Sequence, residues 1–151
     1  MAEPDAPDEQ LAAVIAQQRA TISELQMPVI QVWDRILALP IVGTLDTART
    51  QEMNEALLEK IIATGAEIVI IDLTGVPIVD TAVAKHLLET VTAARLLGAE
   101  AMLVGLAPRI AITLVHLGID LSGILTRGTL AHGLELAFAH LDLEVLPMRT
   151  A

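Results

Sequence analysis

The chain has 151 residues, a length that suits one domain with a sizeable buried core. Its formal net charge of −10 would repel nucleic-acid phosphates and anionic lipid surfaces, so we expect neither nucleic acid nor membrane as a partner. The absence of cysteine excludes disulfides and thiolate zinc sites, and no apolar run reaches the ~18 residues that cross a bilayer. Because the first residues lack the basic and apolar regions of a secretion signal, we expect a cytoplasmic protein.

The N-terminal residues divide into two parts. Residues 1–8 are rich in proline and acids, and we expect them to form a disordered leader. Residues 9–25 predict a short helix, in which a heptad seam is formed by Leu11, Ile15, Gln18, Ile22 and Leu25. Such a seam serves either a helix that lies on its own domain or a coiled coil between two copies. From the seam and the high apolar content we expect at least a dimer.

A β-hairpin is expected next. Pro28 ends the helix, because the residue before a proline disfavours helical backbone angles. The segments Val29–Trp33 and Ile36–Val42 are then predicted to be strands joined by a tight antiparallel turn. The first of them alternates apolar and polar residues, as is typical of an edge strand.

The rest of the chain alternates helices with strands. Asp46 or Thr47 can cap a helix that extends to about Ala63. We expect its apolar stripe to be buried; the stripe consists of Met53, Leu57, Leu58, Ile61 and Ile62. The β-branched run Glu67–Leu73 is typical of a central strand buried on both faces. The remaining expected elements are helices Thr81–Leu97, Pro108–Leu117 and Thr129–Leu141, and strands Ala101–Val104 and Ile124–Thr126.

This order, β-β-α-β-α-β-α-β-α, predicts an α/β fold. The sheet should be mixed and mostly parallel, with one antiparallel hairpin, and should be flanked by helices. We expect residues 26–142 to form this domain and residues 143–151 to be a C-terminal tail.

Catalytic motifs of this architecture are missing from the sequence. No glycine-rich nucleotide loop, nucleophile elbow or zinc-protease motif occurs, and the four histidines, His86, His116, His132 and His140, are scattered. Asp72 and Asp80 could form an acid/base pair, but no nucleophile or basic pocket accompanies them. We therefore expect no enzyme activity, no cofactor and no metal site.

One segment carries the functional signal. In Asp72–Thr81, a strand ends in an acid, a glycine-bearing turn follows, and an Asp–Thr pair opens a helix. This segment resembles the phosphorylation site of STAS domains, the anti-sigma-factor-antagonist fold. Closest is the C-terminal domain of RsbR-type stressosome scaffold proteins, to which four further segments are similar: Val83–Leu87, Arg95–Ala99, Gly105–Pro108 and Leu117–Ser122.

The resemblance implies a phosphorylatable interaction module in stress signalling. It implies that a switch serine/threonine kinase modifies Thr81 and that Thr113 matches a second phosphorylation site. Asp72, Asp80 and Lys85 would belong to the interaction surface beside Thr81. The domain would bind and release the kinase, act as a stressosome-like scaffold or anti-sigma-factor antagonist, and assemble with paralogous STAS proteins.

Simpler explanations for the two threonines stay open. A threonine at a helix N-terminus is explained by capping alone, and the Thr113 hydroxyl could bond back to the carbonyl of Arg109. A different function, a small-molecule-binding sensor or carrier module on the same fold, is also open. A phosphate on Thr81 would suit the helix N-terminus, so it should change binding without unfolding the domain.

Overall fold

The computed structural model describes residues 9–15, 28–144 and 146–148. Residues 9–15 are helical. Between residues 28 and 144 the elements are, in chain order, β1 (Ile30–Trp33), β2 (Ile36–Val42), α2 (Thr47–Thr64), β3 (Ile68–Gly75), α3 (Thr81–Leu96), β4 (Glu100–Val104), α4 (Pro108–His116), β5 (Leu125–Arg127) and α5 (Leu130–His140).

These strands form a five-stranded sheet in the order β1-β2-β3-β4-β5. β1 pairs antiparallel with β2, and every other neighbouring pair is parallel. The predicted mixed sheet with one hairpin is therefore confirmed. The β-branched run of β3, Ile68–Ile71, is completely buried at the centre of the sheet, as its composition predicts.

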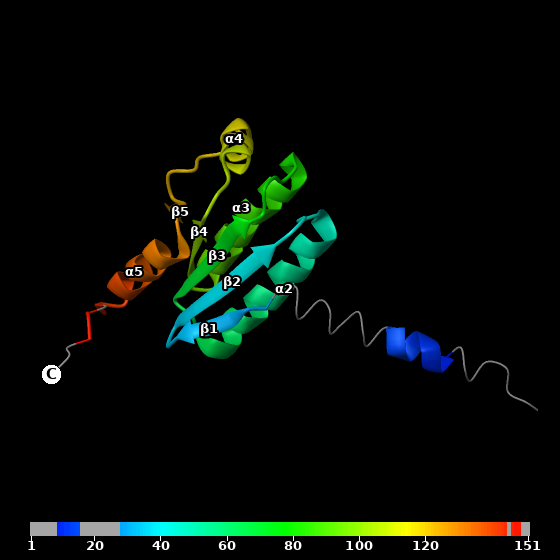
Figure 1. The fold of residues 1–151 in the computed structure, drawn as a ribbon, viewed down its shortest axis with the longest axis horizontal. Helices are drawn as coiled ribbons and strands as arrows, with labels where there is room; N and C mark the ends of the chain where they lie inside the picture. Colours follow the sequence, from blue (N-terminus) through cyan, green and yellow to red (C-terminus); the bar gives the residue numbers. More distant parts are fainter. Residues whose placement is uncertain (1–8, 16–27, 145, 149–151) are drawn as a thin grey trace, which may run out of the picture.

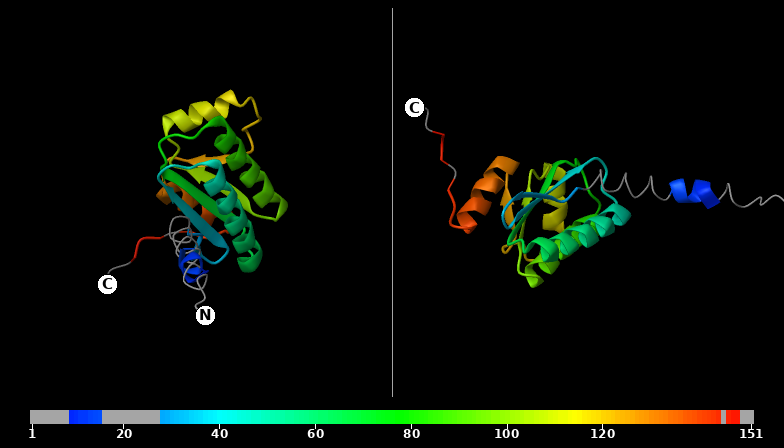
Figure 2. Two further views of the ribbon diagram at one scale, coloured as in Figure 1. Left: turned by 90° about the vertical axis from the view of Figure 1, so that its right-hand side faces the viewer. Right: turned by 90° about the horizontal axis from the view of Figure 1, so that it is seen from below.

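Helices cover the two faces of the sheet unequally. α2, α3 and α4 contribute buried residues to the larger core on one face, whereas α5 packs over a smaller core on the other. Figure 1 labels these elements, and the right-hand view of Figure 2 shows α5 across the sheet from α2 and α3. α5 approaches the sheet closely at Gly133, where an added Cβ would lie 2.8 Å from Cγ1 of Val104.

α2 shows where the apolar stripe was predicted correctly and where it was wrong. Asp46 caps the helix by accepting a hydrogen bond from the backbone N–H of Arg49 at 2.8 Å. Ile62 is 70% exposed, although it was predicted to be buried. Thr50, which was not predicted to be part of the buried stripe, is buried. Helical periodicity explains the shift, because one face is shared by Thr50, Met53, Leu57 and Ile61. The Thr50 hydroxyl donates to the Asp46 carbonyl, which allows a polar residue inside the core.

Only part of the predicted N-terminal helix can be compared. Its described residues, 9–15, expose Leu11, Val14 and Ile15 to solvent. The seam residues Gln18, Ile22 and Leu25 lie outside the described residues, so the predicted coiled coil stays a prediction. Of the helices that the structure describes, none combines the length and the hydropathy needed to cross a membrane.

The burial of the central strand β3 predicts how a substitution in it changes stability. Ile70→Ala should lower the free energy of unfolding by about 2–5 kcal/mol, because it removes buried methyl groups and leaves a cavity between the two layers. Urea denaturation of the variant and the wild-type chain measures the difference. Ile62→Ala, on the exposed side of α2, serves as the control and should change stability little. An unchanged midpoint for Ile70→Ala would contradict the placement of β3.

Candidate functional site

The carboxyl ends of the parallel strands bring three helix starts to one edge of the sheet. β2, β3 and β4 run in the same direction, and each is followed by a helix that begins beyond its end. The β3–α3 loop holds the predicted phosphorylation segment at this edge. Val76 and Val79 are buried and anchor the loop, whereas Ile78 between them is half-exposed. The loop therefore presents a fixed apolar side chain just before Thr81.

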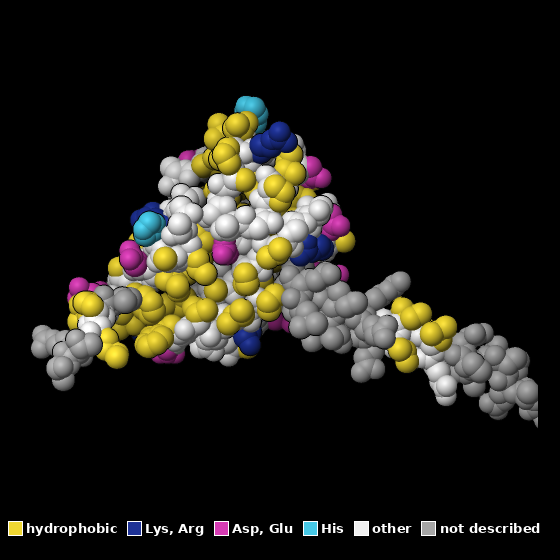
Figure 3. All heavy atoms as spheres, in the orientation of Figure 1, with side chains coloured by type: hydrophobic (Ala, Val, Ile, Leu, Met, Phe, Trp, Pro, Cys, Tyr) yellow, Lys and Arg dark blue, Asp and Glu magenta, His cyan; other side chains and the backbone are white. Residues whose placement is uncertain are grey.

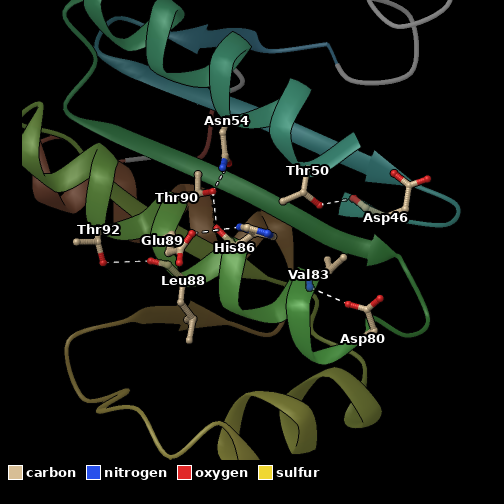
Figure 4. Close-up of polar contacts among 10 residues, drawn as sticks. All are labelled: Asp46, Thr50, Asn54, Asp80, Val83, His86, Leu88, Glu89, Thr90 and Thr92. Atoms are coloured by element: carbon tan, nitrogen blue, oxygen red, sulfur yellow. Dashed lines mark hydrogen bonds and ion pairs between the residues drawn. The ribbon is translucent and has the colours of Figure 1, made fainter. Parts of the chain in front are cut away.

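Asp80 determines where α3 begins. Its backbone is extended, and its carboxylate accepts a hydrogen bond from the backbone N–H of Val83 at 2.8 Å (Figure 4). The structure thus gives the capping role to Asp80, not to Thr81. Thr81 is the first helical residue and is exposed, and its hydroxyl takes part in no hydrogen bond among the described residues. The explanation of Thr81 as a capping residue is therefore wrong.

Lys85 follows Thr81 by one helical turn and is exposed on the same side of α3. It stands at one end of a groove of about 330 Å³ that continues along the helix, lined by Lys85, Leu88, Glu89, Thr92, Ala93, Leu96 and Ile119. Ile119 reaches this groove from the loop between α4 and β5. Its participation could not be predicted from sequence, because it lies far from α3 along the chain.

That loop is braced by its own hydrogen bonds. The backbone N–H of Ser122 donates to Oδ1 of Asp120 at 3.0 Å, and the Ser122 hydroxyl donates to the same oxygen at 2.6 Å. These two bonds lower the pKa of Asp120. The carboxylate of Asp120 is thus the hydrogen-bond acceptor in the turn that follows Ile119.

Asp72 was predicted to belong to the interaction surface, and the structure gives its carboxylate a local role. Oδ1 accepts from the backbone N–H of Thr74 at 3.0 Å and from the Thr74 hydroxyl at 2.6 Å. Gly105 packs directly on this turn, where an added Cβ would overlap Oγ1 of Thr74. Gly105 also has a φ of +68°, which a side chain would disfavour. Asp72 and Thr74 thus shape the end of β3.

Thr113 lies on a different helix from Thr81. Its hydroxyl donates to the carbonyl of Arg109 in the preceding turn of α4 at 2.9 Å, as the simpler explanation from sequence expected. Asp80, Thr81 and Lys85 therefore lie together at the start of α3, whereas Thr113 lies on the neighbouring helix α4.

A buried polar contact ties α3 to α2. The hydroxyl of Thr90 contacts Oδ1 of Asn54 across the two helices and the carbonyl of His86 at 2.9 Å (Figure 4). His86 also pairs with Glu89, with Nδ1 and Oε2 separated by 3.1 Å. This contact could not be predicted from the sequence, because neither Thr90 nor Asn54 stands out in it. In the described part of the chain, no three histidine or acidic side chains are grouped to hold a metal ion.

Comparisons with known proteins agree with this geometry. A family model described as STAS domain matches residues 27–132. RsbT co-antagonist protein RsbRA of Bacillus subtilis is 40% identical over 134 residues, which cover 89% of this chain and 49% of that protein. The chain thus spans about half the length of the curated relative.

Solved structures show the same likeness. A serine-to-glutamate variant of Moorella thermoacetica RsbS is 31% identical with a TM-score of 0.69, over 78% of this chain and 99% of that one. A chain in the solved molecular architecture of the stressosome, a signal integration and transduction hub, is also 31% identical to this chain. Its TM-score is 0.67, over 77% of this chain and 100% of that chain.

The capping contact predicts the effects of two substitutions. Asp80→Ala should lower the free energy of unfolding by about 0.5–2 kcal/mol, because the N–H of Val83 loses its acceptor. Asp80→Asn should restore most of this loss, since an asparagine side chain also caps well. Urea denaturation compares the two variants. Equal stability of Asp80→Ala and wild type would show that Asp80 does not cap α3.

Proposed function

This chain belongs to the STAS domain family, and on that premise we propose that it is a phosphorylatable protein-interaction module of a stress-signalling pathway. In this proposal it binds and releases a switch serine/threonine kinase as a stressosome-like scaffold or anti-sigma-factor antagonist, and phosphorylation of Thr81 controls the release. The relatives named RsbT co-antagonist and stressosome proteins support this reading.

One observation carries the proposal: the Thr81 hydroxyl is exposed and is not needed by the fold. Asp80 already provides the cap, so a kinase could modify Thr81 without removing a structural hydrogen bond. The buried Val76 and Val79 hold the loop in place on one side, and α3 holds it on the other. A kinase would therefore meet a rigid, accessible hydroxyl.

The electrostatics of this position favour a change of binding over a change of fold. A phosphate adds about −1.5 to −2 charges at neutral pH. At a helix N-terminus it is stabilised by first-turn N–H groups and by the helix dipole. Lys85, one turn further along α3, is placed to pair with it. The modified domain should stay folded, while any partner docked here meets additional negative charge.

The kinase would dock on the surface around Thr81. Ile78 gives an exposed apolar contact before the site, and Asp80 and Lys85 flank it with opposite charges. The groove that begins at Lys85 extends this surface along α3. In this arrangement a partner contacts both apolar and charged groups, and phosphorylation of Thr81 changes only the charge.

Thr113 is the proposed second site, and its geometry differs. Because its hydroxyl donates to the carbonyl of Arg109, modification there replaces an existing hydrogen bond. The exposed Arg109 lies one turn away on the same helix and could pair with the phosphate. We propose that Thr113 is a second site of phosphorylation, on α4.

Several wider features belong to the same proposal. The chain would act without catalysis, in the cytoplasm, together with paralogous STAS proteins and with further copies of itself. Residues 26–142 would form the STAS domain, preceded by a leader and a short helix and followed by a C-terminal tail. The similarity to the RsbR co-antagonist proteins and to the stressosome chain supports these assignments.

Phosphosite mapping tests the assignment, and the chain offers a matched control. Incubation with ATP and a switch kinase from the same genome should place phosphate on Thr81, and Thr81→Ala should lose most of the incorporation while staying folded. Thr47 has the same setting, because it is the exposed first residue of α2 and follows the capping Asp46. Thr47→Ala should incorporate phosphate like the wild type.

Two results would contradict the assignment. Equal incorporation in wild type and Thr81→Ala, with the phosphate mapped to another residue, would remove Thr81 as the site. A partial loss in both Thr81→Ala and Thr47→Ala, with phosphate mapped to both threonines in the wild type, would show that the kinase modifies any Asp–Thr helix start.

A further inference from the structure

One edge of a sheet face stays exposed beside the helix that covers the face. On this face α5 packs against β3, β4 and β5. The four residues of β1, at the edge of the sheet, are all exposed, whereas Ile36 of β2 is completely buried. Ile36 belongs to the core under α5, so alternation along β2 and its register with β1 place Ile30 on this same face.

The only tryptophan and the only phenylalanine of the chain meet where this exposed edge adjoins α5. Trp33 and Phe138 meet edge to face, with ring centroids 5.6 Å apart and an interplanar angle of 80°. They line a pocket of about 410 Å³ together with Leu143, Glu144 and Leu146. Trp33 is 54% exposed and Leu146 is 70% exposed. We call the surface formed by Ile30, Trp33, Phe138, Leu143 and Leu146 the Trp33 face.

The Trp33 face has the composition of a protein interface. Apolar side chains gather on this side of the molecule, between α5 and the β1–β2 hairpin (Figure 3). Large aromatic residues in such a patch dominate the binding energy of protein interfaces. Glu144 is the only charged residue that lines its pocket. The patch is therefore suited to an apolar partner.

A second exposed apolar surface occurs in the same chain. Leu11, Val14 and Ile15 follow the spacing of one helical face and are all exposed on the described helix 9–15. One chain thus displays an exposed apolar helix face and an exposed apolar patch beside β1. We infer that two copies of this chain associate, with the helix 9–15 of each copy packed on the Trp33 face of the other.

Charge favours this arrangement over other contacts between copies. At a formal net charge of −10, two copies repel each other over most of their surfaces. α2 carries Glu52, Glu55 and Glu59 on the opposite layer, so that layer is a poor contact between copies. The Trp33 face lets two copies meet through apolar groups. A two-fold pair forms each helix-to-face contact twice, which doubles the buried apolar area.

This inference rests on the self-association in the proposed function but not on phosphorylation. Thr81 begins α3, which packs on the opposite face of the sheet. Because the test below uses no kinase, its failure leaves the assignment of Thr81 untouched. Failure of the phosphosite mapping likewise leaves the Trp33 face untouched.

The experiment combines mass with the emission of Trp33. The chain has no tyrosine and a single tryptophan, so its fluorescence reports this surface alone. Across a dilution series of the full chain, analytical ultracentrifugation should show dimers that dissociate. The tryptophan emission should shift to longer wavelength over the same concentrations, as water reaches the ring.

Three variants locate the contact. Leu146→Ser changes the Trp33 face, Ile15→Ser changes the helix, and each should raise the dissociation constant about tenfold or more. Ile62→Ser is the matched control, because Ile62 on α2 is as exposed as Leu146, at 70% each. The control should associate like the wild type. None of these exposed residues is needed for folding.

Four results would overturn the inference. A monomer at all concentrations would exclude a second copy, and a monomer with constant, water-shielded Trp33 would show that the chain covers its own face or holds a small apolar ligand. Dimers weakened by Ile15→Ser but with unchanged Trp33 emission on dilution would show pairing through the helices alone. Dimers unaffected by Leu146→Ser would place the contact elsewhere.

Discussion

The hydrogen bond from the N–H of Val83 to the carboxylate of Asp80 is the contact on which the candidate site depends. It fixes the first turn of α3 and makes Thr81 the first helical residue. The same contact leaves the Thr81 hydroxyl out of the cap, because the side chain of Asp80 is the N-cap acceptor. Buried Val76 and Val79 then hold the loop at a constant position on the sheet edge. A hydroxyl that is both accessible and fixed follows from these contacts.

The sheet separates the two proposed surfaces. Thr81, Lys85 and the groove lie on the helix layer formed with α2 and α4, whereas the Trp33 face lies on the layer of α5. Between them stands the fully buried run of β3. In the proposed function, a phosphate at the edge would alter binding without disturbing the core. Assembly through the opposite face would then persist while the kinase binds and leaves.

The fold could be predicted from the sequence wherever one physical cause acted alone. The β-branched run Ile68–Ile71 indicates a doubly buried strand, because few other environments accept it. For α2, either Asp46 or Thr47 was expected to cap the helix, and the structure gives the cap to Asp46. The candidate site was predicted from the resemblance of Asp72–Thr81, together with the four segments after it, to STAS domains.

Competition between causes explains what the sequence missed. Asp80 and Thr81 can both cap a helix, and only the extended backbone at Asp80 decides between them. From the sequence, Ile62 is expected in the buried stripe, and only the structure shows that the buried face of α2 excludes it. The contribution of Ile119 to the groove and the contact of Trp33 with Phe138 join residues far apart in the chain. No local pattern contains that information.

The most direct test of the central claim is the affinity of the switch kinase for the wild-type domain before and after stoichiometric phosphorylation, measured at low and high salt. If exposed charge at Thr81 is the switch, the two affinities differ at low salt and the difference shrinks at high salt, because ions screen exposed charges. The amide spectrum of the core strands should stay the same. Identical affinities for the two forms at low salt would contradict the account.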